Sequence, residues 1–279
     1  MIGNILEESM AASRKKGKAE LIFFINAGDP NLKVTYEMLK VLARHGLVAV
    51  ELCIPFPKSL TDGALIRESH ERALSNGDEF DGILKLANKA YKELGLSVVI
   101  LADYSHTVKP KGLVNFLEQC EAAGVSATLI HCLPPLMRKA YVRHSEQLGL
   151  GRIMSFFIGS DDNTRAAAYR ESLGFVYVVS QFGRTGNRVN FDSDVSEQLK
   201  AIRSETIKPL AVGFGVKTKE DVETLVASGA DAVIIGSAAT ALVGRNLNTP
   251  EQIPVEFEKL VEYFASACTV TQNSIHSSL

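Results

Sequence analysis

The chain has 279 residues, of which 46% are hydrophobic and 22% are charged, and its formal net charge is −2. This composition is typical of a globular protein, and the near-neutral charge gives no reason to expect nucleic acid or an anionic membrane as a partner. Apolar runs such as Leu21–Ile25 are too short to span a bilayer. The N-terminal stretch has no apolar signal-peptide centre, so we expect a cytoplasmic protein.

Apolar, β-branched runs alternate with stretches of helical periodicity along the whole chain. The runs predict eight strands, at Ala19–Asn26, Val48–Ile54, Ser97–Asp103, Ala127–Leu133, Ile153–Ile158, Phe175–Ser180, Pro209–Gly213 and Asp231–Gly236. Helices are expected at 4–16, 31–45, 64–75, 80–94, 111–123, 135–148, 162–172, 193–204, 218–228 and 251–267. Eight strand–helix units favour a parallel sheet closed into one (β/α)8 TIM barrel over residues 1–279, with an extra N-terminal helix.

Two carboxylates stand out near the end of the second predicted strand. Glu51 interrupts the apolar run Val48–Ile54, where a buried, unpaired carboxylate is costly, and Asp62 lies on the loop that follows. An acid within a strand and an acid on the next loop can face one cavity from two sides, and different surroundings would give them different protonation states. The alternative is a partly exposed strand-end glutamate and an ordinary Asp-Gly turn.

Glycines at the ends of the last two predicted strands indicate a phosphate site. Gly213 ends the seventh strand and Gly215 lies just after it, whereas Gly236 ends the eighth and Ser237 opens a helical stretch. Backbone N–H groups beside glycine, together with the positive end of a helix, bind anions, and barrels commonly place phosphate there. The loop 182–186 could complete the site. The alternative is that these glycines only form tight turns.

Cysteines and histidines show no spacing typical of a zinc site or a disulfide framework. Cys53 and Cys132 lie in apolar runs, which favours small buried side chains at both positions.

Several motifs together resemble the tryptophan synthase α-subunit family, in order and in spacing, over nearly the whole chain. They are Gly28-Asp29-Pro30, Glu51 with Pro55-Phe56 and Asp62-Gly63, Tyr104 with Gly112, Tyr177–Ser180 with Gly183 and Thr185-Gly186, Gly213-Phe214-Gly215, and Gly236-Ser237. The resemblance implies a TIM barrel that splits indole-3-glycerol phosphate into indole and glyceraldehyde 3-phosphate. It also implies that no metal or organic cofactor is needed.

The family's functional residues map onto this chain. Glu51 matches the acid/base that protonates the indole C3, Asp62 matches the carboxylate that accepts from the indole N–H, and Tyr177 matches a tyrosine beside the glutamate. The resemblance implies the remaining binding residues: Phe24, Ala102, Tyr104, His131, Thr185 and Phe214 for the ring site and its closure, and Gly186, Gly213, Gly215, Gly236 and Ser237 for the phosphate.

Two groups of departures from the family pattern bear on the partner and on the substrate. Cys53 replaces a glycine, and Pro57-Lys58-Ser59 replaces Ser-Asp-Pro in the loop that faces the β-subunit in the family, which makes a β-subunit partner doubtful. In the ring site, Ala102, His131 and Ser155 take places that are usually leucine, a small residue and isoleucine, and Asp103 is an unexpected carboxylate. These changes are either compensated drift or the mark of a larger or more polar ring.

Three hypotheses remain at this point. The first is an indole-3-glycerol phosphate lyase that works without a β-subunit. The second is a diverged lyase for another aryl-glycerol phosphate, in which His131 and Asp103 recognise the ring. The third is a non-catalytic paralogue that binds a phosphorylated ligand, and the presence of Glu51 and Asp62 weighs against it.

Overall fold

The computed structural model describes residues 2–77, 80–179, 193–213 and 215–269. In this part of the chain, nine parallel strands form one sheet. They are β1 (Glu20–Asn26), β2 (Ala49–Cys53), β3 (Ser97–Asp103), β4 (Ala127–His131), β5 (Gly151–Arg152), β6 (Met154–Phe157), β7 (Val176–Val179), β8 (Leu210–Gly213) and β9 (Ala232–Ile235).

The sheet curls into a barrel because its two edge strands are neighbours in the chain. The strand order is β5-β4-β3-β2-β1-β9-β8-β7-β6, and only Ile153 separates β5 from β6. The N–H of Ile153 donates to the carbonyl oxygen of Thr128 over 2.9 Å, which extends the pairing with β4. The predicted barrel is therefore confirmed. The predicted fifth strand, Ile153–Ile158, corresponds to β6, and the two-residue β5 before it was not predicted.

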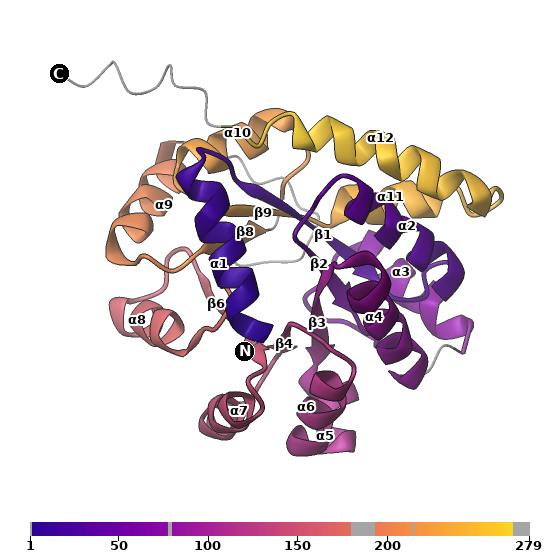
Figure 1. The fold of residues 1–279 in the computed structure, drawn as a ribbon, viewed down its shortest axis with the longest axis horizontal. Helices are drawn as coiled ribbons and strands as arrows, with labels where there is room; N and C mark the ends of the chain where they lie inside the picture. The colour runs from indigo at the N-terminus through magenta and orange to yellow at the C-terminus, as the bar shows by residue number, and fades with distance from the viewer. Residues whose placement is uncertain (1, 78–79, 180–192, 214, 270–279) are drawn as a thin grey trace.

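Helices surround the sheet in the order that the sequence predicts (Figure 1). They are α1 (Ile2–Lys15), α2 (Leu32–Arg44), α3 (Ala64–Ser75), α4 (Phe80–Leu94), α5 (Lys109–Lys111), α6 (Leu113–Ala122), α7 (Pro135–Leu148), α8 (Asp162–Glu171), α9 (Ser193–Glu205), α10 (Lys219–Ala227), α11 (Ser237–Arg245) and α12 (Ile253–Ala265). A 3-10 turn, η2 (Pro250–Gln252), precedes α12.

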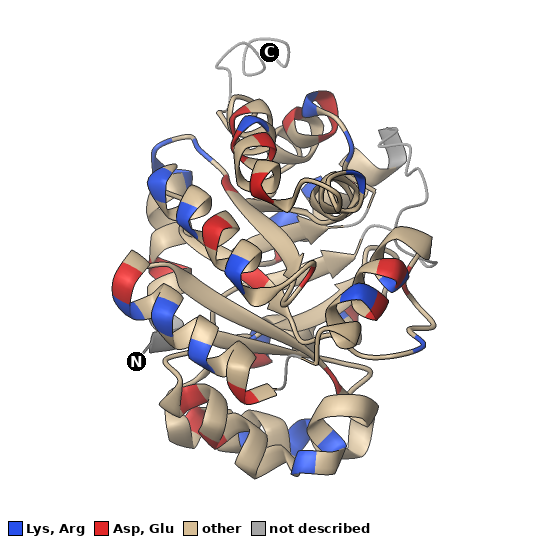
Figure 2. Cartoon of the chain, turned by 90° about the vertical axis from the view of Figure 1, so that its right-hand side faces the viewer, with Lys and Arg blue, Asp and Glu red and all other residues tan. Residues whose placement is uncertain are grey.

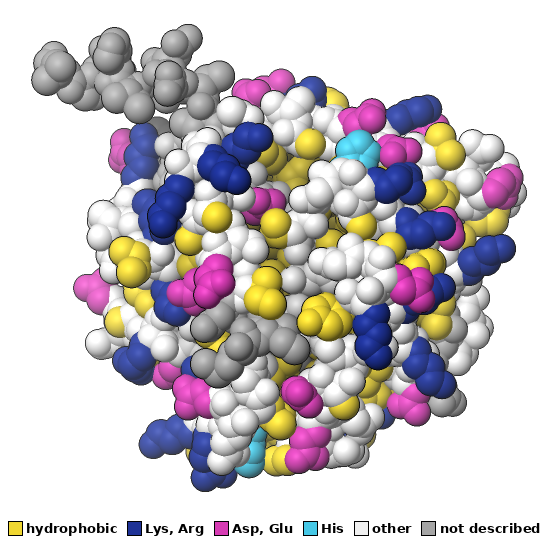
Figure 3. Space-filling view, in the orientation of Figure 1, with side chains coloured by type: hydrophobic (Ala, Val, Ile, Leu, Met, Phe, Trp, Pro, Cys, Tyr) yellow, Lys and Arg dark blue, Asp and Glu magenta, His cyan; other side chains and the backbone are white. Residues whose placement is uncertain are grey.

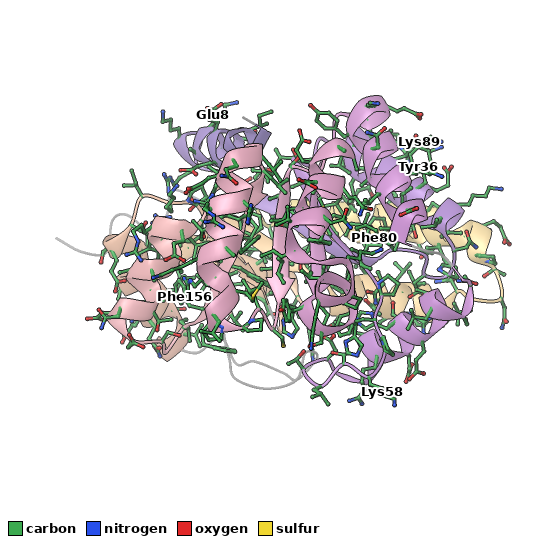
Figure 4. The ribbon with its side chains drawn as sticks, turned by 90° about the horizontal axis from the view of Figure 1, so that it is seen from below. Glu8, Tyr36, Lys58, Phe80, Lys89 and Phe156 are labelled. Carbon is green, nitrogen blue, oxygen red and sulfur yellow. The ribbon has the colours of Figure 1, made fainter. Side chains whose placement is uncertain are left out.

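The predicted N-terminal helix closes one end of the barrel. Leu6 and Met10 of α1 are fully buried and belong to the same apolar cluster as Ile22 and Phe175 inside the barrel. In Figure 4, α1 with Glu8 lies at one end of the molecule, and the loop that carries Lys58 lies at the other. Access to the barrel interior is therefore from the carboxyl ends of the strands.

Side chains of the strands alternate between two apolar layers, as the period of two in a β-strand requires. On β3, Val99 packs inside the barrel, whereas Val98, Ile100 and Ala102 pack against the surrounding helices. This alternation decides which strand residues can face a ligand.

A π-helical turn, η1 (Tyr104–Val108), follows β3 and was not predicted. Asp103 caps it, since its carboxylate accepts from the backbone N–H of His106 over 2.8 Å and lies 2.7 Å from Nδ1 of the same histidine. The unexpected strand-end carboxylate therefore has a local structural role, and Asp103 is not among the residues that line the cavity described below.

Basic and acidic residues are interspersed along the helices (Figure 2), and the face shown in Figure 3 carries no region dominated by one sign. None of the described helices is long and apolar enough to cross a membrane.

Candidate active site

A cavity of about 610 Å³ opens at the carboxyl ends of the strands. Pockets of several hundred cubic ångströms hold most of a small ligand's surface. The lining of this cavity includes eight of the predicted site residues: Phe24, Glu51, Asp62, His131, Tyr177, Gly215, Gly236 and Ser237. The remaining lining is mostly apolar, with Phe56, Leu129 and Ile234 among its residues.

Glu51 reaches this cavity from β2. It pairs in register with Phe24 of β1 and Val99 of β3, and both of these side chains point inside the barrel. Glu51 is only 2% exposed, and no hydrogen bond links its carboxyl group to another described residue. Burial, and then the nearby charge of Asp62, raise the pKa of Glu51 from 4.5 to about 8. At neutral pH this carboxyl group therefore carries a proton.

Asp62 has the opposite surroundings. The hydroxyl of Ser59 donates to its carboxylate over 2.7 Å, and Nε2 of His70 lies 3.3 Å from the same oxygen. The Asp62 side chain is 16% exposed. Donors and partial solvation favour the ionised form of a carboxylate. The site thus combines a protonated carboxyl group with a charged one.

The sequence reasoning missed His70, which orients Asp62. This histidine is 2% exposed on α3, and its Nδ1 accepts the backbone N–H of Phe56 over 3.3 Å. Because Nδ1 accepts, the proton of the neutral ring lies on Nε2 and points to Asp62. The only signal in the sequence is a histidine eight residues after Asp62, and nothing local distinguishes it from an ordinary helix residue.

Tyr177 enters the cavity from β7 because Gly213 leaves room for its ring. A Cβ at Gly213 would lie 2.3 Å from the Tyr177 hydroxyl oxygen, so no other residue fits there without displacing the tyrosine. Burial, and then the charges of Glu51 and Asp62, raise the pKa of Tyr177 well above its ordinary value. Its phenol therefore stays protonated. Gly213 itself is not among the lining residues.

The predicted phosphate end lies beside β9. Ser237 is the first residue of α11, Gly236 precedes it, and both line the cavity. The first-turn N–H groups of a helix have no acceptor within the helix and carry a partial positive charge. Gly215 also lines the cavity, with a φ of 78° that favours glycine.

Ala102 and Tyr104 are the predicted ring-site residues that the structure places outside the cavity. Ala102 faces the helices, and Leu101 forms the wall instead. Tyr104 begins η1 and packs against the helix-side core. The expectation that Ala102 belongs to the ring site is corrected accordingly, because adjacent strand residues point to opposite faces.

The remaining predictions concern three further site residues, two cysteines and the metal-binding side chains. Thr185, Gly186 and Phe214 lie outside the described residues. Cys53 is buried as expected, but Cys132 is exposed, has a φ of 54° and lines the cavity. Within the part of the chain that the structure describes, no group of three or more His, Cys, Asp or Glu side chains could hold a metal ion.

His131 and Ser155 add hydrogen-bonding groups to the cavity wall, His131 at the end of β4 and Ser155 within β6. Nε2 of His131 and the hydroxyl oxygen of Thr61 share a hydrogen bond of 3.1 Å, which joins the β4 end to the loop that carries Asp62. Ser155 is the register partner of Tyr177, and its side chain is exposed to the open cavity.

Comparisons with known proteins agree with this geometry. The family profile for the tryptophan synthase alpha chain matches residues 10–269. The tryptophan synthase alpha chain of Synechocystis sp. is 35% identical over 84% of this chain and 89% of its own length, and that of Arabidopsis thaliana is 30% identical over 94% of each.

Solved structures give the same result. A mutant tryptophan synthase alpha-subunit from the hyperthermophile Pyrococcus furiosus superposes with a TM-score of 0.81 at 28% identity, and it covers 90% of this chain and 99% of its own. The matches in sequence and structure extend over the barrel and its cavity together. The chain belongs to the tryptophan synthase alpha chain family.

Proposed function

We propose that this protein is a lyase that cleaves indole-3-glycerol phosphate into indole and glyceraldehyde 3-phosphate. The observation that carries the proposal is the pair of unlike carboxyl groups in one cavity. Glu51 is buried, with a pKa of about 8, and Asp62 accepts hydrogen bonds from Ser59 and His70. Such a pair suits a reaction that needs a proton donor and a fixed negative charge at one substrate.

In the proposed reaction, Glu51 gives its proton to C3 of the indole ring, and positive charge develops at the ring nitrogen. Asp62 accepts a hydrogen bond from the ring N–H and stabilises that charge. The bond between C3 and the glycerol carbon then breaks, and its electron pair returns to the ring. The hydroxyl group on that carbon becomes the aldehyde as its proton passes to the Glu51 carboxylate, which restores the acid.

The remaining residues position the substrate in this proposal. Gly215, Gly236 and Ser237 hold the phosphate at the N-terminus of α11, and Gly186 and Gly213 contribute through their backbone. Phe24 and Phe214 flank the ring, Tyr177 donates from its phenol beside Glu51, and Thr185 helps to close the site. The cavity position of Phe24, Tyr177, Gly215, Gly236 and Ser237 supports this arrangement.

We also infer that the enzyme works without a β-subunit. The loop that faces the β-subunit in the family has Pro57-Lys58-Ser59 in place of Ser-Asp-Pro. Lys58 has a φ of 55°, which bulky residues adopt only at an energetic cost, and Ser59 is engaged with Asp62 inside the site. This loop is therefore shaped around the catalytic aspartate of its own chain.

Indole release by the purified protein alone tests both proposals. Steady turnover of indole-3-glycerol phosphate without a partner would support them together. Turnover only after addition of a tryptophan synthase β-subunit would keep the lyase and overturn the independence. Tight binding of a glycerol phosphate with no cleavage under either condition would identify a non-catalytic paralogue instead.

A further inference from the structure

The wall of the cavity opposite the phosphate end carries hydrogen-bonding groups. Around the closed sheet, β4 lies four steps from β9 in either direction when β5 and β6 count as one strand. The end of β4 therefore faces the N-terminus of α11 across the barrel mouth. His131 ends β4, and Ser155 lies on the adjoining β6.

A substrate held by its phosphate at α11 must direct its ring toward this wall. Glu51 and Asp62, which would contact C3 and the ring N–H, come from β2 and from the loop after it. With the five-membered ring fixed there and the glycerol phosphate beside β9, the outer edge of the six-membered ring points to β4 and β6. His131 at the end of β4 and Ser155 within β6 are polar side chains of that wall.

Both side chains keep a free hydrogen-bonding group in the described structure. His131 uses Nε2 with Thr61, and its Nδ1 has no partner among the described residues. The Ser155 hydroxyl makes no hydrogen bond to any described residue. An unsubstituted ring would displace water from these two groups without providing a hydrogen-bond partner. Desolvating a polar group in this way costs free energy and weakens binding.

We propose that this site selects an indole-3-glycerol phosphate whose six-membered ring carries a hydroxyl group, held by His131 and Ser155. The inference rests on the proposed lyase reaction and names its substrate class. A hydroxyl group can donate to one partner and accept from the other, so it satisfies both side chains at once. Sites built to hydrogen-bond a substrate hydroxyl discriminate strongly against the analogue that lacks it. The hydroxyl takes no part in the bond cleavage.

The test compares kcat/KM for indole-3-glycerol phosphate with kcat/KM for analogues hydroxylated at each open carbon of the six-membered ring. We expect at least one hydroxylated compound to be preferred by about tenfold or more. We also expect His131→Ala and Ser155→Ala each to reduce that preference. Equal kcat/KM for all compounds in the parent enzyme would overturn the inference while leaving the lyase function intact.

Thr61→Val is the matched control, because it removes the partner of His131 but keeps the imidazole. If His131 only fastens the Asp62 loop, Thr61→Val and His131→Ala will lower the rates of all substrates by the same factor and leave the preference unchanged, which contradicts the inference. Selective loss in His131→Ala, with the preference retained in Thr61→Val, supports it.

Binding to the Glu51→Gln variant separates the two proposals. Calorimetry should show tighter binding of the hydroxylated compound to this variant. If neither compound is cleaved by the parent enzyme but the hydroxylated one binds more tightly, the lyase proposal fails and the selectivity stands. Equal binding of the two compounds overturns the selectivity whatever the catalytic result.

Discussion

Two buried carboxyl groups lie at opposite ends of this barrel, and their surroundings differ completely. Asp231 precedes β9 at the end that α1 covers, and it is 3% exposed. Its oxygens accept from Arg203 over 2.6 Å, from the N–H of Leu210 over 2.8 Å and from Arg14 over 3.2 Å. Burial raises the pKa of Asp231, and these three partners oppose that rise. The group ties α1, α9 and β8 together as a structural anion.

Glu51 is equally buried at the open end of the barrel but has no cation and no donor among the described residues. The absence of a partner leaves the cost of burying its charge uncompensated, so the group keeps its proton up to a pH of about 8. In TIM barrels the end formed by the carboxyl termini of the strands carries the chemistry, whereas the opposite end serves stability. We propose that the two carboxyl groups follow that division, and the following changes test the proposal.

The largest effect is expected from Glu51→Gln. The amide keeps the size of the side chain but cannot donate an acidic proton, so turnover should fall by roughly 10³-fold or more while substrate still binds. Steady-state indole release and calorimetric binding measure the two quantities. Near-normal turnover would remove Glu51 from the acid/base role.

Asp62→Asn should have the next largest effect. A neutral amide cannot offset positive charge on the ring nitrogen, so we expect kcat to fall by roughly 10²-fold. Ser59→Ala is a useful companion, because it removes one donor to Asp62 but keeps the charge, and it should cost much less. A rate for Asp62→Asn within a few-fold of the parent enzyme would reject the electrostatic role.

Asp231→Asn should lower the stability of the fold and leave turnover unchanged. It leaves Arg203 and Arg14 without their shared counter-charge, which should lower the free energy of unfolding by about 3 kcal/mol. The rate per folded molecule should stay unchanged, because the site lies at the other end of the barrel. Urea unfolding and active-site titration measure the two effects, and a large change in the rate with unchanged stability would contradict the comparison.

A pH-dependent effect on stability is expected from Glu51→Gln. The folded-state pKa of Glu51 is about 8 and the ordinary value is 4.5, so between these values the folded state binds more protons than the unfolded state. The stability of the parent protein should therefore fall as pH rises through this window, and the variant should lack that contribution.

At pH 9 the variant should be more stable than the parent protein by an amount on the order of a few kcal/mol, and the difference should shrink toward pH 5. Unfolding in urea at the two pH values gives both numbers. A difference that does not change with pH would show that Glu51 is already ionised in the folded protein at neutral pH.

The sequence is enough to predict the barrel and the carboxylate pair, because both depend on local patterns. Apolar runs give the strands, and Glu51 inside such a run is conspicuous. The errors come from features that local patterns do not determine. The split between β5 and β6 depends on how the sheet closes, and the outward direction of Ala102 depends on the register of β3.

The roles of the other site residues that the sequence does not reveal depend on tertiary contacts. His70 meets Asp62 only because α3 packs beside the loop, and Gly213 is a glycine partly because Tyr177 of the neighbouring strand needs the space. From the sequence, Asp103 could be interpreted as a functional carboxylate. In the structure its carboxylate contacts the backbone N–H and Nδ1 of His106, so it caps η1. Residue type and spacing suggest a function in such cases, and only the contacts decide it.

Infrared difference spectroscopy measures the protonation state of Glu51 directly. Spectra of the parent protein minus Glu51→Gln, recorded as pH rises, isolate the carbonyl band of one protonated carboxyl group. We expect this band to persist at neutral pH and to disappear with a midpoint near pH 8. A band that vanishes near the ordinary value of 4.5 would contradict this expectation, and Glu51 would then be an anion without a proton to give.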